Sequence, residues 1–358
     1  MRARGTRLAC VASAFALALA VGGGVAAADS PARLEAPWPA ATGSLRFVGD
    51  ADARPVRRAL AGAEWWGGAY TAGTGETVRI LVSTAYPRDD AVARGWADFF
   101  AGLRHGDELA RATVYLAPLA EVAAVCGGDA LGCYASDELV VVGNSTDGVT
   151  PQEVAAHEYG HHLARNRLNP PWLAVDRGTK RWSSGVSVCS RVASGEFLSG
   201  DEGDGYSHNP AEGFAEAYRV FNEARAGATT FSWPIVDPAF YPDAGAFAAI
   251  DADVTHPWAA PATRAVTARF TRRGPRVVVI PLAATLDGEL SATIRLTGGS
   301  THELELLDAK RHTVLARGLW AGVARKTLGF LVCGQRDLAL RVVRRGPPGP
   351  VRIVVRTP

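Results

Sequence analysis

The hydrophobic pattern of the chain changes its period near residues 255–264, and this change constrains the fold more than any other sequence feature. Before it, residues 77–83, 112–117 and 138–143 show the apolar runs of buried strands. Residues 90–104 instead show apolar positions at helical spacing. The first part of the chain therefore predicts an α+β arrangement.

After residue 262 the apolar residues recur at every second position, as they do at Leu290, Ala292 and Ile294. Similar runs recur toward the C-terminus, separated by Gly, Pro and Asp turns. Six to eight short strands of this kind predict a small β-sandwich. This part contains no nucleophile or ligand cluster, so we expect it to act as a support or to attach the protein to a cell wall or glycan.

The first residues of the chain indicate the cellular compartment in which the protein acts. Residues 1–28 combine Arg2, Arg4 and Arg7 with an apolar run and a small-residue cleavage site, as in a secretory signal peptide. The alternative, a membrane anchor, needs about 20 uninterrupted apolar residues, and the glycines at 22–24 weaken the run. We therefore predict an exported, extracellular protein without stable membrane insertion.

About 330 residues remain after such cleavage, which favours two domains. We predict a catalytic α+β domain over residues 29–254 and a β-sandwich domain over residues 263–358. Residues 29–75 either belong to the catalytic domain or form a removable pro-segment.

The charge balance excludes two classes of partner. The chain has 38 Lys and Arg against 36 Asp and Glu, a formal charge of +2. Without the three arginines of the leader the formal charge is −1. No strong basic excess remains, so neither nucleic acid nor an anionic membrane is an expected partner.

Four cysteines remain after the leader, an even number that favours disulfides in an exported chain. Four cysteines allow three pairings. Cys126 and Cys133 flank a short glycine-rich loop that closes locally, so we favour this pair and, by elimination, Cys189 with Cys333. The spacing does not fit a zinc ribbon.

The segment 153–166 carries the clearest chemical motif. The stretch 150–153 combines a hydroxyl cap, a proline and a glutamate, which predicts a helix start. His157 and His161 then lie four residues apart on one helical face, where two imidazoles can reach one cation. Glu158 lies about 100° around the helix and could reach an activated water without binding the metal.

A polar surface helix is the alternative interpretation of this motif. It conflicts with the opposite arc of the same helix, which consists of Ala155, Ala156, Tyr159 and Leu163. Gly160 indicates close backbone packing, because glycine costs a helix about 1 kcal/mol relative to alanine. His162 points away from the two candidate ligands, so we expect it to pack or to form hydrogen bonds.

A catalytic zinc site needs a third protein ligand. The version with a third histidine and a methionine turn is excluded, since the only methionine is Met1. A second predicted helix within residues 206–221 offers Glu212 as third ligand and Glu216 as a carboxylate that orients a bound histidine. Glu212 could instead belong to a solvated, ion-paired face shared with Arg219 and Glu223, or it could serve only as a member of a capping box.

Together the two segments, His157-Glu158-Tyr159-Gly160-His161 and residues 209–218, resemble the gluzincin metallopeptidases. They are most similar to the branch that contains anthrax lethal factor and the bacterial Pro-Pro endopeptidases, whose second helix carries a similar run. The match covers about 65 residues and implies a zincin-like fold for the first domain. It also implies an edge strand near residues 130–136 that holds the substrate backbone.

The resemblance further implies site roles. Glu158 is the general base, and a tyrosine shortly before the third ligand donates to the oxyanion; Tyr206 fits that role, with His208 as the competing donor. The implied ligands of a single Zn²⁺ ion are His157, His161 and Glu212.

The sequence thus predicts a secreted zinc metallopeptidase that hydrolyses a peptide or protein substrate with metal-activated water and a glutamate base. One rival is a secreted, non-catalytic metal-containing binding protein. The other is a zinc amidase directed at peptidoglycan.

Overall fold

The computed structural model describes residues 53–128, 130–146, 148–201, 203–232, 236–296, 301–322 and 325–358. The predicted signal peptide, residues 1–28, lies outside the described residues, as do residues 29–52 of the predicted N-terminal segment. Within the described ranges, no helix is long and apolar enough to cross a membrane.

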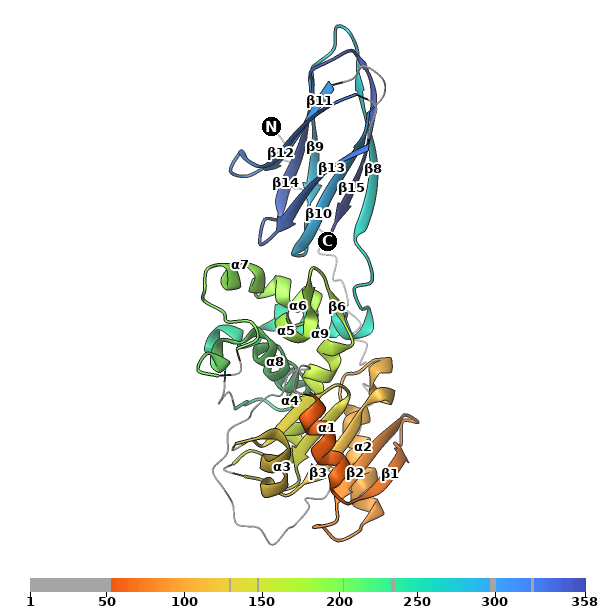
Figure 1. Cartoon of the computed structure of the whole chain (residues 1–358), viewed down its shortest axis with the longest axis vertical. Helices are drawn as coiled ribbons and strands as arrows, with labels where there is room; N and C mark the ends of the chain where they lie inside the picture. The colour runs from red at the N-terminus through yellow and green to blue at the C-terminus, as the bar shows by residue number, and fades with distance from the viewer. Residues whose placement is uncertain are drawn as a thin grey trace, which may run out of the picture.

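A five-stranded mixed sheet forms the base of the N-terminal α/β region (Figure 1). Its strand order is β1-β2-β3-β5-β4. The parallel centre consists of β2 (Thr77–Ser83), β3 (Thr113–Ala117) and β5 (Glu138–Val142), and the antiparallel edges are β1 (Trp65–Thr71) and β4 (Gly132–Ala135). The continuous apolar runs of the central strands follow from burial on both faces.

Three helices cover this sheet. Helix α2 (Asp90–Gly102), whose N-terminal amides are capped by Asp89, packs against β1 and β2. Helix α1 (Ala53–Gly62) contacts both α3 (Leu119–Cys126) and the edge strand β4. All four residues of β4 are buried, so this sheet edge is covered.

Two longer helices carry the candidate site. Helix α4 (Pro151–Arg165) packs on β4 and β5, and helix α8 (Pro210–Arg225) packs on α4. Thr150 and Glu153 form the predicted capping box of α4, and the Asn209 side chain accepts from the amide of Ala211 at the start of α8. Nearly the whole of α4 is buried, which excludes a surface helix.

Short elements connect these helices. They are η2 (Asp107–Arg111), β6 (Leu168–Asn169), β7 (Trp172–Leu173), α5 (Ala174–Arg177), α6 (Lys180–Gly185), α7 (Val188–Ala193), η3 (Tyr206–His208), η4 (Pro238–Phe240) and α9 (Ala244–Thr255).

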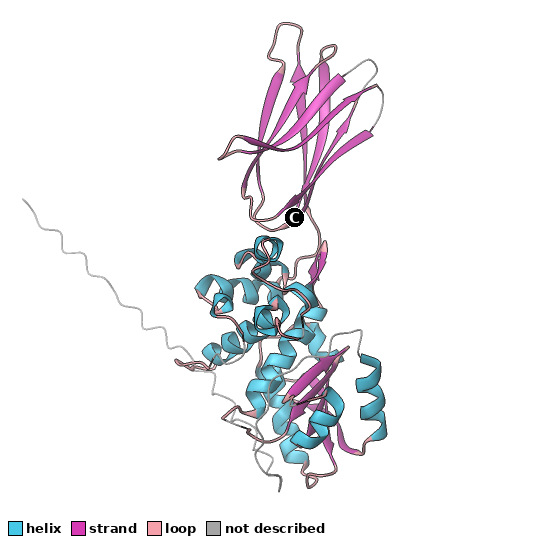
Figure 2. Ribbon diagram, turned by 60° about the vertical axis from the view of Figure 1, so that its left-hand side comes forward, coloured by secondary structure: helices cyan, strands magenta, loops and turns pink. Residues whose placement is uncertain are grey.

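The C-terminal region consists of two four-stranded antiparallel sheets. Figure 2 shows this region as strands joined by loops. The first contains, in order, β13 (Arg325–Val332), β10 (Gly288–Arg295), β15 (Gly349–Thr357) and β8 (Ala262–Phe270). The second contains β12 (Thr313–Ala321), β11 (Thr301–Asp308), β14 (Asp337–Arg344) and β9 (Val277–Ala283). Leu290, Ala292 and Ile294 are buried in the core of this region, so the predicted sandwich-like arrangement is confirmed.

Two disulfides are present, Cys126–Cys133 and Cys189–Cys333, as predicted. They are consistent with an extracellular location. The second disulfide joins α7 to the C-terminal region.

Hydrogen bonds reinforce that junction. The Asp287 amide donates to Ser184 Oγ at 2.9 Å, and Arg336 donates both to the Asp287 carboxylate and to the Ser184 carbonyl.

Candidate metal centre

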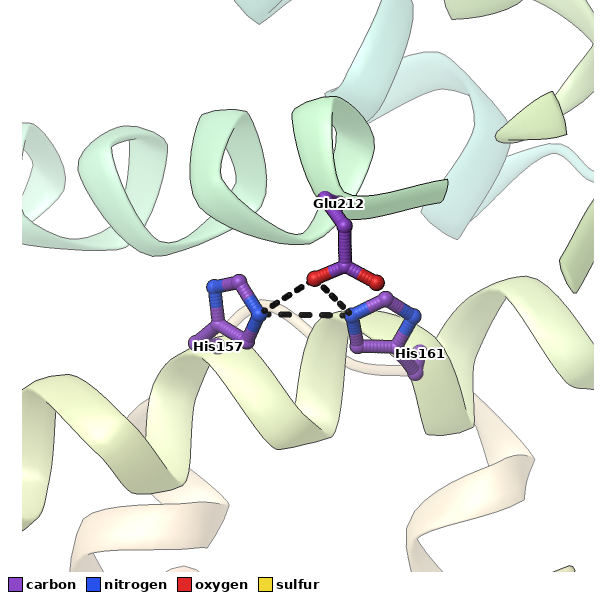
Figure 3. A group of neighbouring side chains, drawn as sticks. All are labelled: His157, His161 and Glu212. Carbon is purple, nitrogen blue, oxygen red and sulfur yellow. Dashed lines mark hydrogen bonds and ion pairs between the residues drawn. The ribbon is translucent and has the colours of Figure 1, made fainter. Parts of the chain in front are cut away.

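Two imidazoles from α4 and one carboxylate from α8 converge on one point (Figure 3). Glu212 Oε2 lies 3.3 Å from His157 Nε2 and 3.9 Å from His161 Nε2. The two imidazole Nε2 atoms are 3.4 Å apart, and all three residues are at most 1% exposed. The group has the composition and spacing to hold one metal ion.

Close contact between the two helices brings these groups together. Gly160 lies between the two histidines on α4, and a Cβ atom there would be 2.7 Å from the Cα of Ala215 on α8. A side chain at this position would therefore push the helices apart. The glycine permits the approach by which Glu212 reaches the histidine pair.

The bonding of Glu212 supports a cation at this point. Tyr206 donates its hydroxyl to Glu212 Oε2 at 2.6 Å, whereas Oε1 is buried and has no hydrogen-bond partner among the described residues. A buried carboxylate oxygen without a partner is costly, and a bound cation removes that cost. Two imidazoles with one carboxylate form a donor set of the kind that zinc uses in catalytic sites.

The protonation of the site without metal follows from the same contacts. Burial opposes charge on His157, but Glu212 and Glu216 outweigh it and raise the pKa of His157 to about 10. Burial, followed by repulsion from His157, lowers the pKa of His161 well below its usual value. Without metal, the site thus holds a proton on His157 and none on His161. A metal ion would have to displace the proton of His157 Nε2 in order to bind there.

Glu216 holds the far side of His157. Its Oε2 lies 2.9 Å from His157 Nδ1, and Arg219 donates to both of its oxygens at 3.0 and 2.7 Å. Burial opposes the charge of Glu216, yet His157 and Arg219 lower its pKa to about 2. The ionised carboxylate therefore accepts a hydrogen bond from the Nδ1–H group, which leaves Nε2 of His157 directed at Glu212.

The alternative of a solvated face on α8 is wrong. Glu212 is 0% exposed and Arg219 is 2% exposed, although Arg219 does pair with Glu223 as the spacing predicts. Arg219 also donates to the Ser232 carbonyl at 2.6 Å. Its role in supporting Glu216 was not predicted, although the three-residue spacing of the two residues was a visible signal.

Glu158 lies between α4 and the edge strand β4. It is fully buried, and a Cβ atom at Gly132 would be 2.7 Å from its Oε1. Its negative charge contributes to the raised pKa of His157, which places it in the electrostatic environment of the site.

The two candidate oxyanion donors have different surroundings. Tyr206, on η3, contacts the metal-binding group through Glu212. His208, on the same short helix, lies with Nε2 3.5 Å from Asp237 and its side chain is 44% exposed. The structure thus brings Tyr206, and not His208, to the candidate ligands.

His162 lies behind the site. Its Nε2 is 2.8 Å from the Glu108 carbonyl oxygen, and its ring packs against Tyr134 and Tyr159. The Glu108 carboxylate forms a buried ion pair with Arg167 at 2.8 Å. This support for α4 was missed in the sequence, since Glu108 lies far from the motif along the chain.

A cavity of about 890 Å³ is lined by Trp172, Arg177 and the loop at 197–201. The Leu198 amide of that loop donates to the His208 carbonyl at 2.9 Å. One wall of the cavity is therefore hydrogen-bonded to the short helix η3, which carries Tyr206.

No family model matches the chain, and no curated protein is similar to it in sequence. The solved structures that are similar to parts of it include the coat protein of Tobacco streak virus, at 10% identity, with a TM-score of 0.16, over 27% of this chain and 87% of that one. An N-terminal endo-1,4-beta-D-xylanase 10B of Clostridium thermocellum with xylohexaose has 12% identity and a TM-score of 0.15, over 26% and 24% of the two chains. CsCBM6-3 of Clostridium stercorarium with cellobiose has 12% identity and a TM-score of 0.15, over 26% and 92%. These scores carry no argument about fold or function.

Proposed function

We propose that the chain is a secreted zinc metallopeptidase with His157, His161 and Glu212 as metal ligands. The observation that carries this proposal is the buried convergence of these three side chains, together with a Glu212 Oε1 atom that has no hydrogen-bond partner in the part of the chain that the structure describes. The proposal includes the predicted division into two domains, with the boundary between residues 254 and 263. The first domain would carry the catalytic activity.

When bound there, zinc would polarise the scissile carbonyl and lower the pKa of a water molecule. Neighbouring residues fix the positions of the proposed metal ligands. Glu216 and Arg219 fix the ring of His157 with Nε2 toward the site, and the contact at Gly160 fixes the distance between the helices.

Glu158 is the proposed general base. It follows His157 on α4 and is buried in the low-dielectric space beside the edge strand. A carboxylate in this position accepts a proton from the attacking water and delivers it to the leaving nitrogen.

Tyr206 is the proposed donor to the oxyanion of the tetrahedral intermediate. Its hydroxyl already donates within the ligand group, at 2.6 Å from Glu212 Oε2. A donor aimed at developing negative charge stabilises the transition state. Because His208 is directed toward Asp237, we assign it no catalytic role.

The substrate is a peptide or protein, and the cavity lined by the 197–201 loop is the proposed site for one of its side chains. The implied edge strand is β4, whose residues are buried. A peptide that binds along this edge must therefore displace what covers β4. Helix α1, one of the elements in contact with β4, belongs to the segment predicted as a pro-segment or as part of the catalytic domain.

The test is hydrolysis of casein and of a quenched-fluorescent peptide library by the zinc-loaded protein. Glu158→Gln should reduce turnover by a factor of about 10² to 10⁴ while zinc content is unchanged. Glu64→Gln, on the exposed surface, serves as the matched control and should leave turnover unchanged.

Two outcomes would contradict the proposal. Turnover of peptidoglycan crosslinks without turnover of peptides would indicate the amidase. A wild-type protein that binds zinc and hydrolyses neither substrate, even after removal of residues before β1, would indicate a non-catalytic binding protein.

A further inference from the structure

Three arginines lie directly opposite one another on the first sheet of the C-terminal region. Arg295 on β10 pairs in register with Arg325 on β13 and with Arg352 on β15. Cross-strand partners in register point to the same face of a sheet. All three arginines are exposed, so they form one row across three strands, which we call the arginine row.

The arginine row has no internal compensation. Like charges directly opposite each other destabilise a sheet. None of the three arginines forms an ion pair with any described residue, and the only acidic side chain on the four strands of this sheet is Glu289. Glu289 lies six residues from Arg295 along β10, or about 20 Å.

The second sheet of the same region treats its charges differently. There Glu305 pairs with both Arg317 and Arg341, and Glu303 pairs with Arg345. The chain thus neutralises the outer charges of one sheet and leaves those of the other unpaired.

The surroundings of the arginine row indicate the chemistry of a partner. The adjacent cross-strand row contains Thr293 and Thr327, whose hydroxyls are 2.9 Å apart, and Ser291 follows on the same face. A guanidinium presents a planar fork of donors that matches a carboxylate. Arginines beside hydroxyls therefore suit a polymer that carries both carboxylates and hydroxyls.

Other polyanions fit this surface less well. By strand alternation the aromatic residues of these strands, Phe270 and Phe330, point inward; Phe270 belongs to the core, and Phe330 is partly buried against it. The described residues of these strands thus offer no outward aromatic ring to stack on nucleic-acid bases. The outward apolar residues, Val354 and Leu331, are too few to insert into a lipid surface.

The arginine row also lies far from the N-terminal region. Strand β10 begins at Gly288, where a Cβ atom would be 2.6 Å from Lys180 Nζ, and ends at Arg295. Seven residues of strand span about 24 Å. A partner bound at the arginine row would therefore leave the metal centre uncovered.

We propose that the arginine row binds a linear acidic polysaccharide through its carboxylates. The β region would then be an attachment module, and this role does not depend on the peptidase activity.

Binding of the full mature protein to immobilised polygalacturonate, measured at 20 and 200 mM salt, tests the proposal. Wild type should bind at low salt and lose affinity at high salt, because exposed charges are screened. The variant R295Q/R352Q should bind at least about tenfold more weakly than wild type. The control K310Q/R311Q removes the same charge from the turn between β11 and β12 and should bind like wild type.

Thermal unfolding of each variant verifies that the β region is folded. Equal binding by wild type and R295Q/R352Q would overturn the proposal, as would an equal loss in the control. Binding to single-stranded DNA or to anionic vesicles with no binding to polygalacturonate would also overturn it.

Discussion

The candidate metal centre of the N-terminal region and the first sheet of the C-terminal region place their charged side chains in opposite ways. In the first, the charged and imidazole groups His157, Glu212, Glu216 and Arg219 are buried next to one another. In the second, the arginine row is exposed and unpaired within the described chain. A buried charge is tolerated only with partners, whereas water solvates an exposed one at little cost.

The difference between buried, paired charges and exposed, unpaired charges suits two different functions. The buried groups are held in fixed positions by their partners, which is what a metal centre and its chemistry require. The exposed arginines keep their full hydrogen-bonding capacity, which suits attraction of a charged partner. The following substitutions test the contrast, from the largest expected effect to the smallest.

Arg167→Met should destabilise the protein by about 3 to 5 kcal/mol, because it leaves the buried Glu108 carboxylate without its cation. Arg317→Met is the matched change in the β region and should cost about 1 kcal/mol or less, since Glu305 keeps Arg341. Urea unfolding measures both. Equal losses would contradict the difference between a buried carboxylate left without a cation and one that keeps a second cation.

Gly160→Ala should cost about 1 to 3 kcal/mol, because the added Cβ would lie 2.7 Å from the Cα of Ala215. It should also weaken zinc binding by moving α8 away from α4. Gly329→Ala on β13 meets no atom within 4 Å and should be neutral or slightly stabilising. A neutral Gly160→Ala variant with unchanged zinc affinity would contradict the proposed role of the helix contact.

Lys180, at the junction of the two regions, should make the free energy of unfolding depend on pH. Burial lowers its pKa to about 8 against the attraction of Asp287 and Asp253, whereas the unfolded chain keeps a value near 10.5. Between these values the unfolded state binds more protons, so this group's contribution to stability rises as pH increases from 8 to 10.5. In Lys180→Met this rise should disappear. Identical pH profiles for the two proteins would refute the assignment.

Arg295→Thr should raise stability by about 0.2 to 1 kcal/mol, because it relieves repulsion from Arg325 and Arg352 and places a good strand former in β10. Thermal unfolding at low and high salt measures the effect, which should shrink as salt screens the charges. A destabilised variant would show that the arginine row contributes to the fold itself.

Local patterns predicted much of this molecule. The two-residue period after 262 predicted the paired antiparallel sheets, and the cap at Thr150 predicted where α4 begins. The spacing of His157 and His161, with Glu212 on a second helix, predicted the group that converges in the structure. Each of these signals depends on residues close together in the chain, where backbone geometry fixes the relation between side chains.

Contacts between distant segments were not predictable in this way. Glu108 and Arg167 are 59 positions apart, and no local period relates them. The burial of β4 likewise arises from tertiary packing, so the resemblance implied an edge strand but not its burial. The direction of Arg219 depends on how α8 packs, because its spacing fits a solvated face equally well.

The zinc content of the purified mature protein tests the central claim most directly. The account predicts one zinc ion per chain in wild type and in the surface control Glu64→Ala, and loss of that zinc in a folded Glu212→Ala variant. Absence of zinc from the wild-type protein after purification with zinc present, or full retention of zinc by Glu212→Ala, would contradict it.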